Sequence, residues 1–191
     1  MRRGGYKTVA TLVNFIAEAM EYKKVSTILN VVDTAIVNGA ANYINETTAM
    51  PTETSMKALS LYLHDTTDGE TPVAFGLNKY KQAIAGLAGA TTYLTEAVKN
   101  QYNTTGFISQ YAGMDLIGLS GQKKLPDGSF IVPNQRIFGS SGIIGDVTTR
   151  GETLTLQSTD INSEKIHIKV NGYSFGIVIT DLSKVAKVVL A

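Results

Sequence analysis

The two histidines of the chain are the first candidates for acid–base chemistry. His167 alternates with Ile166 and Ile168, which predicts a position on the polar face of a strand. His64 is expected at the end of a helix, where a cation interacts favourably with the helix dipole. Neither has a second His, a Cys or a carboxylate at the spacing of a metal site. We therefore expect structural roles for both histidines and no metal site.

Two glycine-containing segments come close to motifs that bind or attack substrates. Gly-Leu-Ser-Gly at 118–121 contains Ser120, but a nucleophile elbow requires Gly-x-Ser-x-Gly, and here the second Gly comes one position early. Gly-Ser-Ser-Gly-Ile-Ile-Gly-Asp at 139–146 lacks the Lys and Ser/Thr of a phosphate-binding loop and the spacing of a dinucleotide fingerprint. We interpret it as a flexible turn that leads into a strand. The sequence therefore predicts no catalytic site, no cofactor and no enzymatic activity.

The composition excludes several further classes of protein. The 191 residues include no Cys, which excludes a disulfide scaffold, a thiol nucleophile and a thiolate zinc site. The net charge is +1 without a long run of one sign, so charge favours neither a nucleic-acid arm nor a membrane patch. Charged side chains interrupt the first apolar segment, and no signal peptide or membrane span is expected. Charged residues make up only 17%, which fits a surface covered by other subunits or a solvated surface rich in Thr and Asn.

A long amphipathic helix is predicted over residues 6–38. Apolar residues recur at helical spacing from Val9 to Ile36, no Pro interrupts them, and Gly39 stands where a left-handed C-terminal cap is needed. At ~1.5 Å per residue the helix would be roughly 50 Å long, which is long for a chain of this size. Lys23 and Lys24 interrupt the apolar stripe, so the buried face is expected to change partner there. An extended molecule follows from these features.

The remainder of the chain predicts a mixed lobe followed by a strand-rich half. A polar connection at 40–54 precedes a helix that ends near residue 64, a strand at 72–77 and helices at 78–87 and 92–102. Strands are expected at 107–110, 114–119, 153–156, 165–170, 173–180 and 185–190, with a tight turn at 124–128 and a loop at 158–164. The strands on either side of that loop predict a hairpin.

The order of these elements, more than any one motif, carries a resemblance. The long helix ends in Asp33, apolar residues and the pair Asn38-Gly39, a strand-then-helix segment follows at 73–87, and a Gly-containing turn lies within 106–117. This order resembles the major capsid protein of tailed bacteriophages. The resemblance implies an α+β, Hong Kong 97-like capsid fold with a spine helix at 6–38 and an axial α/β domain. The peripheral domain would comprise 1–50 and 143–171, and the axial domain 51–142 and 172–191.

The same resemblance implies a function and a set of partners. The chain would be a structural subunit of a phage or prophage icosahedral capsid, synthesised in the bacterial cytoplasm and located in the virion. Its partners would be copies of itself in pentamers and hexamers, portal and scaffolding proteins, and packaged DNA bound without sequence readout. Family members carry an N-terminal arm and an extended hairpin, the E-loop, before the spine helix, and residues 2–7 match only the end of that hairpin. We expect the chain to be a fragment of a longer protein.

Two segments are candidate contacts between subunits by their order along the chain. The segment at 158–164, between two peripheral strands, would meet other capsomers near a three-fold axis, and the segment at 122–128 would lie near the five- or six-fold axis. A plain solvated turn is the alternative for both. The candidate residues are Ser158, Thr159, Asp160, Ile161 and Asn162 in the first segment, and Lys123, Lys124, Leu125 and Pro126 in the second.

Two other functions remain open at this point. An encapsulin-type cellular shell has the same fold and a different cargo. A small α+β ligand-binding or enzymatic domain is the other class, in which the loop from Gly139 to Gly145 and Ser120 would line a pocket.

Overall fold

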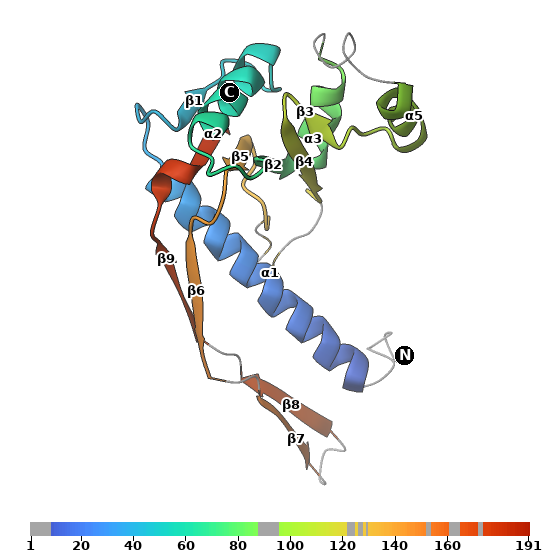
Figure 1. Cartoon of the computed structure of the whole chain (residues 1–191). Coiled ribbons are helices and arrows are strands. Elements are labelled where there is room, and N and C mark those ends of the chain that lie inside the picture. The colour runs from blue at the N-terminus through green and yellow to red at the C-terminus, as the bar shows by residue number, and fades with distance from the viewer. Residues whose placement is uncertain are drawn as a thin grey trace.

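The computed structural model describes residues 9–87, 96–121, 125, 128, 130–151, 154–160, 165–171 and 174–191. Helices and strands gather in a head at one end of the molecule, and one long helix and two strand ribbons extend from it (Figure 1). The expected extended shape is therefore confirmed for this part of the chain.

The long helix α1 is continuous from Val9 to Ala35. Its 27 residues span about 40 Å at ~1.5 Å per residue. The expected end at 38 is three residues too late, although the Ile36 amide still donates to the Val32 carbonyl at 3.2 Å. Gly39 has a φ of +88° and lies in the turn after the helix. No break occurs at the lysines, and the side chains described as buried lie in the second half of α1 and directly after it: Ser26, Leu29, Val32 and Ile36.

A six-stranded mixed sheet forms the centre of the head, in the order β1-β10-β5-β2-β4-β3. β1 is parallel to β10, β2 is parallel to β4, and the other neighbours are antiparallel. A 3-10 turn, η1 (Leu182–Lys184), precedes β10. The strands are β1 (Tyr43–Asn45), β2 (Val73–Leu77), β3 (Gln110–Tyr111), β4 (Met114–Leu119), β5 (Arg136–Ser140) and β10 (Val185–Val189).

Helices α2 (Glu53–Asp65) and α3 (Asn78–Ala85) pack against this sheet, and α5 (Glu96–Thr105) lies at the side of the head (Figure 1). α2 approaches β5 closely because Gly139 has no side chain. A Cβ at Gly139 would lie 2.5 Å from Leu63 Cδ1 and 3.1 Å from Leu59 Cδ1. Gly139 and Ser140 thus belong to strand β5 of the core sheet. The expectation of a flexible turn at 139–146 is therefore wrong for these first two residues.

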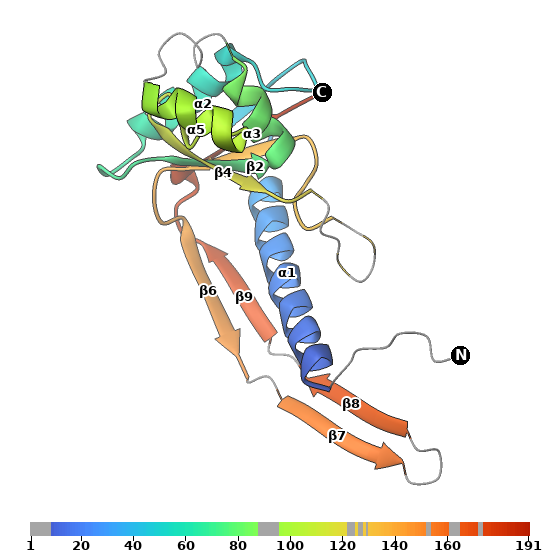
Figure 2. The ribbon, with the colours of Figure 1, turned by 90° about the vertical axis from the view of Figure 1, so that its right-hand side faces the viewer.

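Two antiparallel ribbons extend from the head in the direction of α1. One joins β6 (Gly145–Arg150) to β9 (Ser174–Ile179), and the other joins β7 (Leu154–Asp160) to β8 (Lys165–Asn171) (Figure 2). The second ribbon is the hairpin expected from the sequence. Its first strand is longer than expected, because Ser158, Thr159 and Asp160 pair with His167, Ile166 and Lys165. The expected loop at 158–164 is therefore corrected at its first three residues, and 161–164 lie outside the described residues.

Two strand pairings join segments from different sides of the expected domain boundaries. β1 lies in residues 1–50, yet it pairs with β10 in the sheet of the head. β9 lies in residues 172–191, yet it pairs with β6 in the first ribbon. Hydrogen bonding therefore groups 43–45 with the head and 174–179 with the ribbons.

Candidate functional site

A group of charged side chains connects α1 to the sheet. Near the end of α1, Asp33 Oδ1 accepts from Lys187 Nζ at 2.8 Å and from Arg136 Nε at 3.2 Å. Lys187 Nζ also donates to the Asp33 carbonyl at 2.5 Å and lies 5.3 Å from the centre of the Tyr43 ring. One helix residue thus binds two neighbouring strands, β10 and β5. We call Asp33, Arg136 and Lys187 the junction.

The junction is partly buried, and its contacts fix the orientation of α1 relative to the sheet. Lys187 is only 5% exposed, and a buried ammonium group needs a charged or carbonyl partner to offset its lost hydration. Nearby, Asn42 is also buried and its amide donates to the Val185 carbonyl at 2.9 Å and to the Leu182 carbonyl at 3.1 Å. These bonds attach the segment after α1 to the start of β10. The direction in which α1 leaves the head is therefore set by specific contacts.

The ribbon of β6 and β9 has two unlike faces. Along β9, Phe175, Ile177 and Ile179 are half-buried, and the residues between them are exposed. α1 lies in contact with β9. In the part of the chain that the structure describes, β6 pairs only with β9 and β7 only with β8, so both ribbons present strand edges without a neighbour. Such edges are surfaces onto which another chain can add.

The two predicted contact segments lie in different parts of the molecule, one in the β7–β8 ribbon and the other in the head. Ser158, Thr159 and Asp160 form the end of β7, far from the head (Figure 1), and Ile161 and Asn162 lie outside the described residues. In the other segment, Leu125 is 5% exposed and belongs to the core. Its prediction as a surface contact is corrected, because its side chain packs inside the head.

The tight turn expected at 124–128 is supported by a bond from the Gly128 amide to the Leu125 carbonyl at 2.9 Å, with a φ of +85° at Gly128. Lys123, Lys124 and Pro126 lie outside the described residues.

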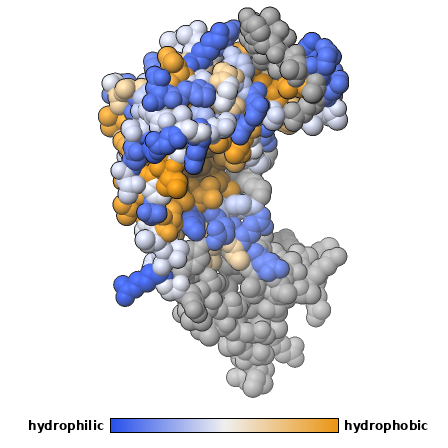
Figure 3. Space-filling model, in the orientation of Figure 1, coloured by the Kyte–Doolittle hydropathy of each residue, from blue (hydrophilic) through white to orange (hydrophobic). Residues whose placement is uncertain are grey.

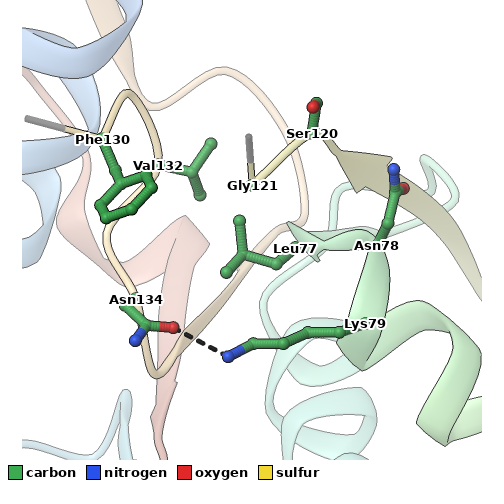
Figure 4. A pocket seen from close by; sticks show the side chains of 8 residues that line it. All are labelled: Leu77, Asn78, Lys79, Ser120, Gly121, Phe130, Val132 and Asn134. Atoms are coloured by element: carbon green, nitrogen blue, oxygen red, sulfur yellow. Dashed lines mark hydrogen bonds between the residues drawn. The ribbon is translucent and has the colours of Figure 1, made fainter. Parts of the chain in front are cut away.

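A pocket of about 470 Å³ opens at the carboxyl ends of β2 and β4. Figure 4 shows Leu77, Val132 and Phe130 on its apolar side, with Lys79 and Asn134 joined at one end by a 3.0 Å hydrogen bond. The described residues that line the pocket are Leu77, Asn78, Lys79, Ser120, Gly121, Phe130, Val132 and Asn134.

The lining of this pocket does not assemble a nucleophile and a base. Ser120 lines it as expected, but the lining residues that are described include no His, Asp or Glu that could take the serine proton. The segment from Gly139 to Gly145 lies at the other end of the strands, because Ser140 pairs with Val73 at the start of β2. The expectation that this segment and Ser120 line one pocket is therefore wrong.

Two other kinds of functional feature are absent from the described residues. They contain no cluster of three or more His, Asp or Glu that could bind a metal ion. None of the helices they form is both long and apolar enough to cross a membrane.

The turn at 181–184, at the end of the strands opposite to the pocket, carries ionised groups. Ser183 donates from its backbone amide at 3.0 Å and from its hydroxyl at 2.5 Å to Asp181, and these bonds lower the pKa of that carboxyl. Lys184 bonds to Asp68, which raises the pKa of the lysine. Both groups are exposed or half-buried, so they act on the electrostatics of the surface and are not arranged as a catalytic pair.

The comparisons with known proteins bear on the fold. No family model and no curated protein matches the chain. Among solved structures, the chain is similar to one titled as the capsid structure of the cyanophage P-SCSP1u, with a TM-score of 0.62 and 8% sequence identity. The match covers 98% of this chain and 67% of that chain. The expected α+β, capsid-like fold is thereby confirmed.

The junction is the feature that the sequence reasoning missed in part. The sequence pattern identifies Asp33 as part of the motif that ends the long helix, but it does not connect Asp33 with Arg136 or Lys187. A signal was present, since Lys187 stands between Ala186 and Val188 in an otherwise apolar strand. A charge at the centre of such a strand indicates a buried partner elsewhere in the chain.

Proposed function

We propose that this chain is the structural subunit of a phage or prophage capsid, which assembles with copies of itself around DNA. The observation that carries the proposal is the combination of a capsid-like fold with an elongated form, in which α1 and two open-edged ribbons leave the head together. Such extensions offer long edges to neighbours. No enzymatic activity is proposed.

The partners and the division into domains form part of the same proposal. The subunits would form pentamers and hexamers in the virion shell, with portal and scaffolding proteins as further partners and DNA met without sequence readout. α1 and the two ribbons would be the peripheral domain, and the six-stranded sheet with its helices the axial domain. In this division 43–45 belong to the axial part and 174–179 to the peripheral part, because strand pairing groups them so.

The candidate contacts follow from this arrangement. Ser158, Thr159 and Asp160, with Ile161 and Asn162 beyond them, would contact other capsomers at the far end of the β7–β8 ribbon. Lys123, Lys124 and Pro126 would contact neighbours near the five- or six-fold axis. Leu125 is left out because it is buried.

The test measures the oligomeric state of the full 191-residue chain. Multi-angle light scattering after size exclusion, with negative-stain electron microscopy, should show rings of five or six subunits or larger shells as concentration rises. Ile161→Glu should reduce this association and leave the melting temperature unchanged, because the proposal assigns residue 161 to a contact between subunits and not to the core. Leu61→Glu is the matched control, since Leu61 is an exposed residue of α2, remote from the ribbon.

A chain that stays monomeric at every concentration would contradict the proposal. An Ile161→Glu profile identical to the unmodified one would remove the loop at the ribbon tip from it.

A further inference from the structure

The two ends of the strands in the head carry surfaces that differ in shape. At one end is the pocket, beside Leu77 of β2, and at the other is the turn at 141–144 that follows β5. β2 and β5 are antiparallel, with Val73 opposite Ser140 and Gly76 opposite Ile137, so the turn and the pocket lie at opposite ends of β2. Five residues of strand separate them by about 17 Å. Within one subunit the turn cannot reach the pocket.

The turn at 141–144 presents one large apolar side chain to solvent. Ile143 is 78% exposed, the highest value among the large apolar side chains of the described residues. Figure 3 shows apolar surface where the head meets α1 and the β6–β9 ribbon. A single exposed apolar residue is ordinary on a protein surface. Ile143 needs an explanation because its backbone is fixed in place.

Hydrogen bonds on both sides of Ile143 hold the turn. Before it, the Ser141 amide donates to the Lys184 carbonyl at 2.9 Å, and the Ser140 hydroxyl donates to the Gly142 carbonyl at 2.8 Å. After it, the Ile144 carbonyl accepts from the amides of Thr180 at 3.0 Å and Asp181 at 3.2 Å. A side chain on such a backbone loses little conformational freedom when it binds. The segment is therefore a rigid support for Ile143.

The surroundings of Ile143 and of the pocket are opposite in charge. Near Ile143, a Cβ at Gly142 would lie 3.8 Å from Glu70 Oε2 and 3.9 Å from Lys184 Nζ, and the carboxylates of Asp68, Asp181 and Glu70 all interact with that one ammonium group. At the pocket, the charged group among the lining residues is Lys79. Its described partners are uncharged, namely Asn134 Oδ1 and the ring of Tyr80 at 4.7 Å. We call these two surfaces the acidic end and the pocket end.

We propose that Ile143 of one copy of this chain enters the pocket of the next copy, with the acidic end of the first facing Lys79 of the second. Phe130, which is 51% exposed at the pocket, would be covered by the same contact. The interface is head-to-tail, because different surfaces of identical chains meet, and repetition of such a contact closes a ring when the rotation allows it. The inference rests on the proposed function, for which it names the surfaces that join neighbouring subunits.

Single cysteines test the contact directly, because the chain itself has none. The full-length variants Ile143→Cys and Ser120→Cys are mixed under mild oxidation at a concentration at which the unmodified chain associates. A disulfide requires the two Cα atoms to lie within about 7 Å. The mixed dimer is expected to exceed, by several fold, both the homodimers of each variant alone and the dimer in a control mixture of Leu61→Cys with Ser120→Cys. Leu61 is 65% exposed on α2, so this mixture measures the background of disulfides that form by random collision.

A second variant leaves the pocket unchanged. Ile143→Glu places a charge where an apolar side chain enters, so the dissociation constant of self-association should rise by ~10-fold or more. Leu61→Glu should leave it unchanged, and both variants should keep the melting temperature of the unmodified chain. Cross-linking at the control level, or association of Ile143→Glu with unchanged strength, would overturn the proposed contact. Native mass spectrometry that found a retained small molecule in the pocket of the assembled protein would overturn it as well.

The failure of this contact can be told apart from failure of the capsid proposal. Rings or shells that form without a cross-link between positions 143 and 120 would reject the contact and leave the proposed function standing. A chain that never associates would reject both.

Discussion

Asp33 is the residue on which the connection between α1 and the head depends most. Its carboxylate receives Lys187 from β10 and Arg136 from β5, and Lys187 is buried. A buried ion pair adds little net stability over an apolar pair, but removal of one partner leaves the other charge without compensation. The cost of a substitution here therefore depends strongly on which groups remain.

We expect Asp33→Ala to lower the free energy of unfolding by about 3 kcal/mol, because the buried Lys187 then keeps only a carbonyl group and the Tyr43 ring as partners and loses its counter-charge. Lys187→Met added to Asp33→Ala should recover a large part of that loss. Urea denaturation followed by circular dichroism measures both. The control is Lys57→Ala, which breaks an exposed pair with Glu53 (2.6 Å) and should cost less than ~0.5 kcal/mol. If Asp33→Ala and Lys57→Ala lowered the free energy of unfolding equally, the junction would not be what holds α1 to the head.

At the scale of the element, α2 begins at a capping box. Thr52 Oγ1 accepts from the Ser55 amide at 3.3 Å, and Ser55 Oγ accepts from the Thr52 amide at 3.1 Å. The Thr52 hydroxyl also donates to Glu46, and this bond is the main reason why the pKa of Glu46 lies below its ordinary value of 4.5. One hydroxyl thus connects the start of α2 to the polar segment before it.

Thr52→Val should lower the free energy of unfolding by about 1 kcal/mol at pH 7, because the helix loses its N-terminal cap. The cost should be smaller at pH 3. A lowered pKa means that the Glu46 bond stabilises the fold above pH 4.5 and is lost as pH falls through the folded-state value. Urea titrations at the two pH values measure the difference. Thr54→Val, an exposed position in the same helical turn, should change stability by no more than ~0.5 kcal/mol. A Thr52→Val cost that did not fall in acid would contradict the role of Glu46.

The spacing of apolar residues predicts which helices and strands this chain forms. It predicts less well where those elements end and what they pack against. α1 and the β7–β8 hairpin were recognised because their apolar spacing repeats over many residues. The end of β7 was misplaced because Ser158, Thr159 and Asp160 are polar, and they are strand residues through pairing with β8. Gly139 was assigned to a loop by its residue type, whereas its position in β5 depends on the approach of α2.

The candidate contacts were predictable only in part, for a related reason. Leu125 lies in a polar, turn-forming segment, and nothing in its immediate sequence shows that its side chain enters the core. The junction and the two ends of the head bring together residues more than fifty positions apart in the chain, such as Asp33 with Lys187 and Leu77 with Asn134. Side-chain proximity over such distances follows from strand order, which the sequence alone did not specify.

At the scale of the whole molecule, the elongated form is itself a property under test. A compact chain of 191 residues has a radius of gyration of ~16 Å. The described part of this chain places α1, which is about 40 Å long, and two ribbons outside the head. The form of the monomer therefore depends on the stiffness of α1 and on the junction, where α1 is attached to the head.

Small-angle X-ray scattering on the dilute monomer should therefore give a radius of gyration clearly above ~16 Å and a distance distribution with a long tail. Ala17→Pro should shorten that tail while the head stays folded, because proline breaks a helix in its interior and Ala17 is an exposed residue in the first half of α1. Ala17→Ser is the matched control and should leave the curve unchanged. A dilute monomer near ~16 Å would mean that α1 folds back onto the head in solution, and the extended edges proposed for assembly would then be absent before subunits meet.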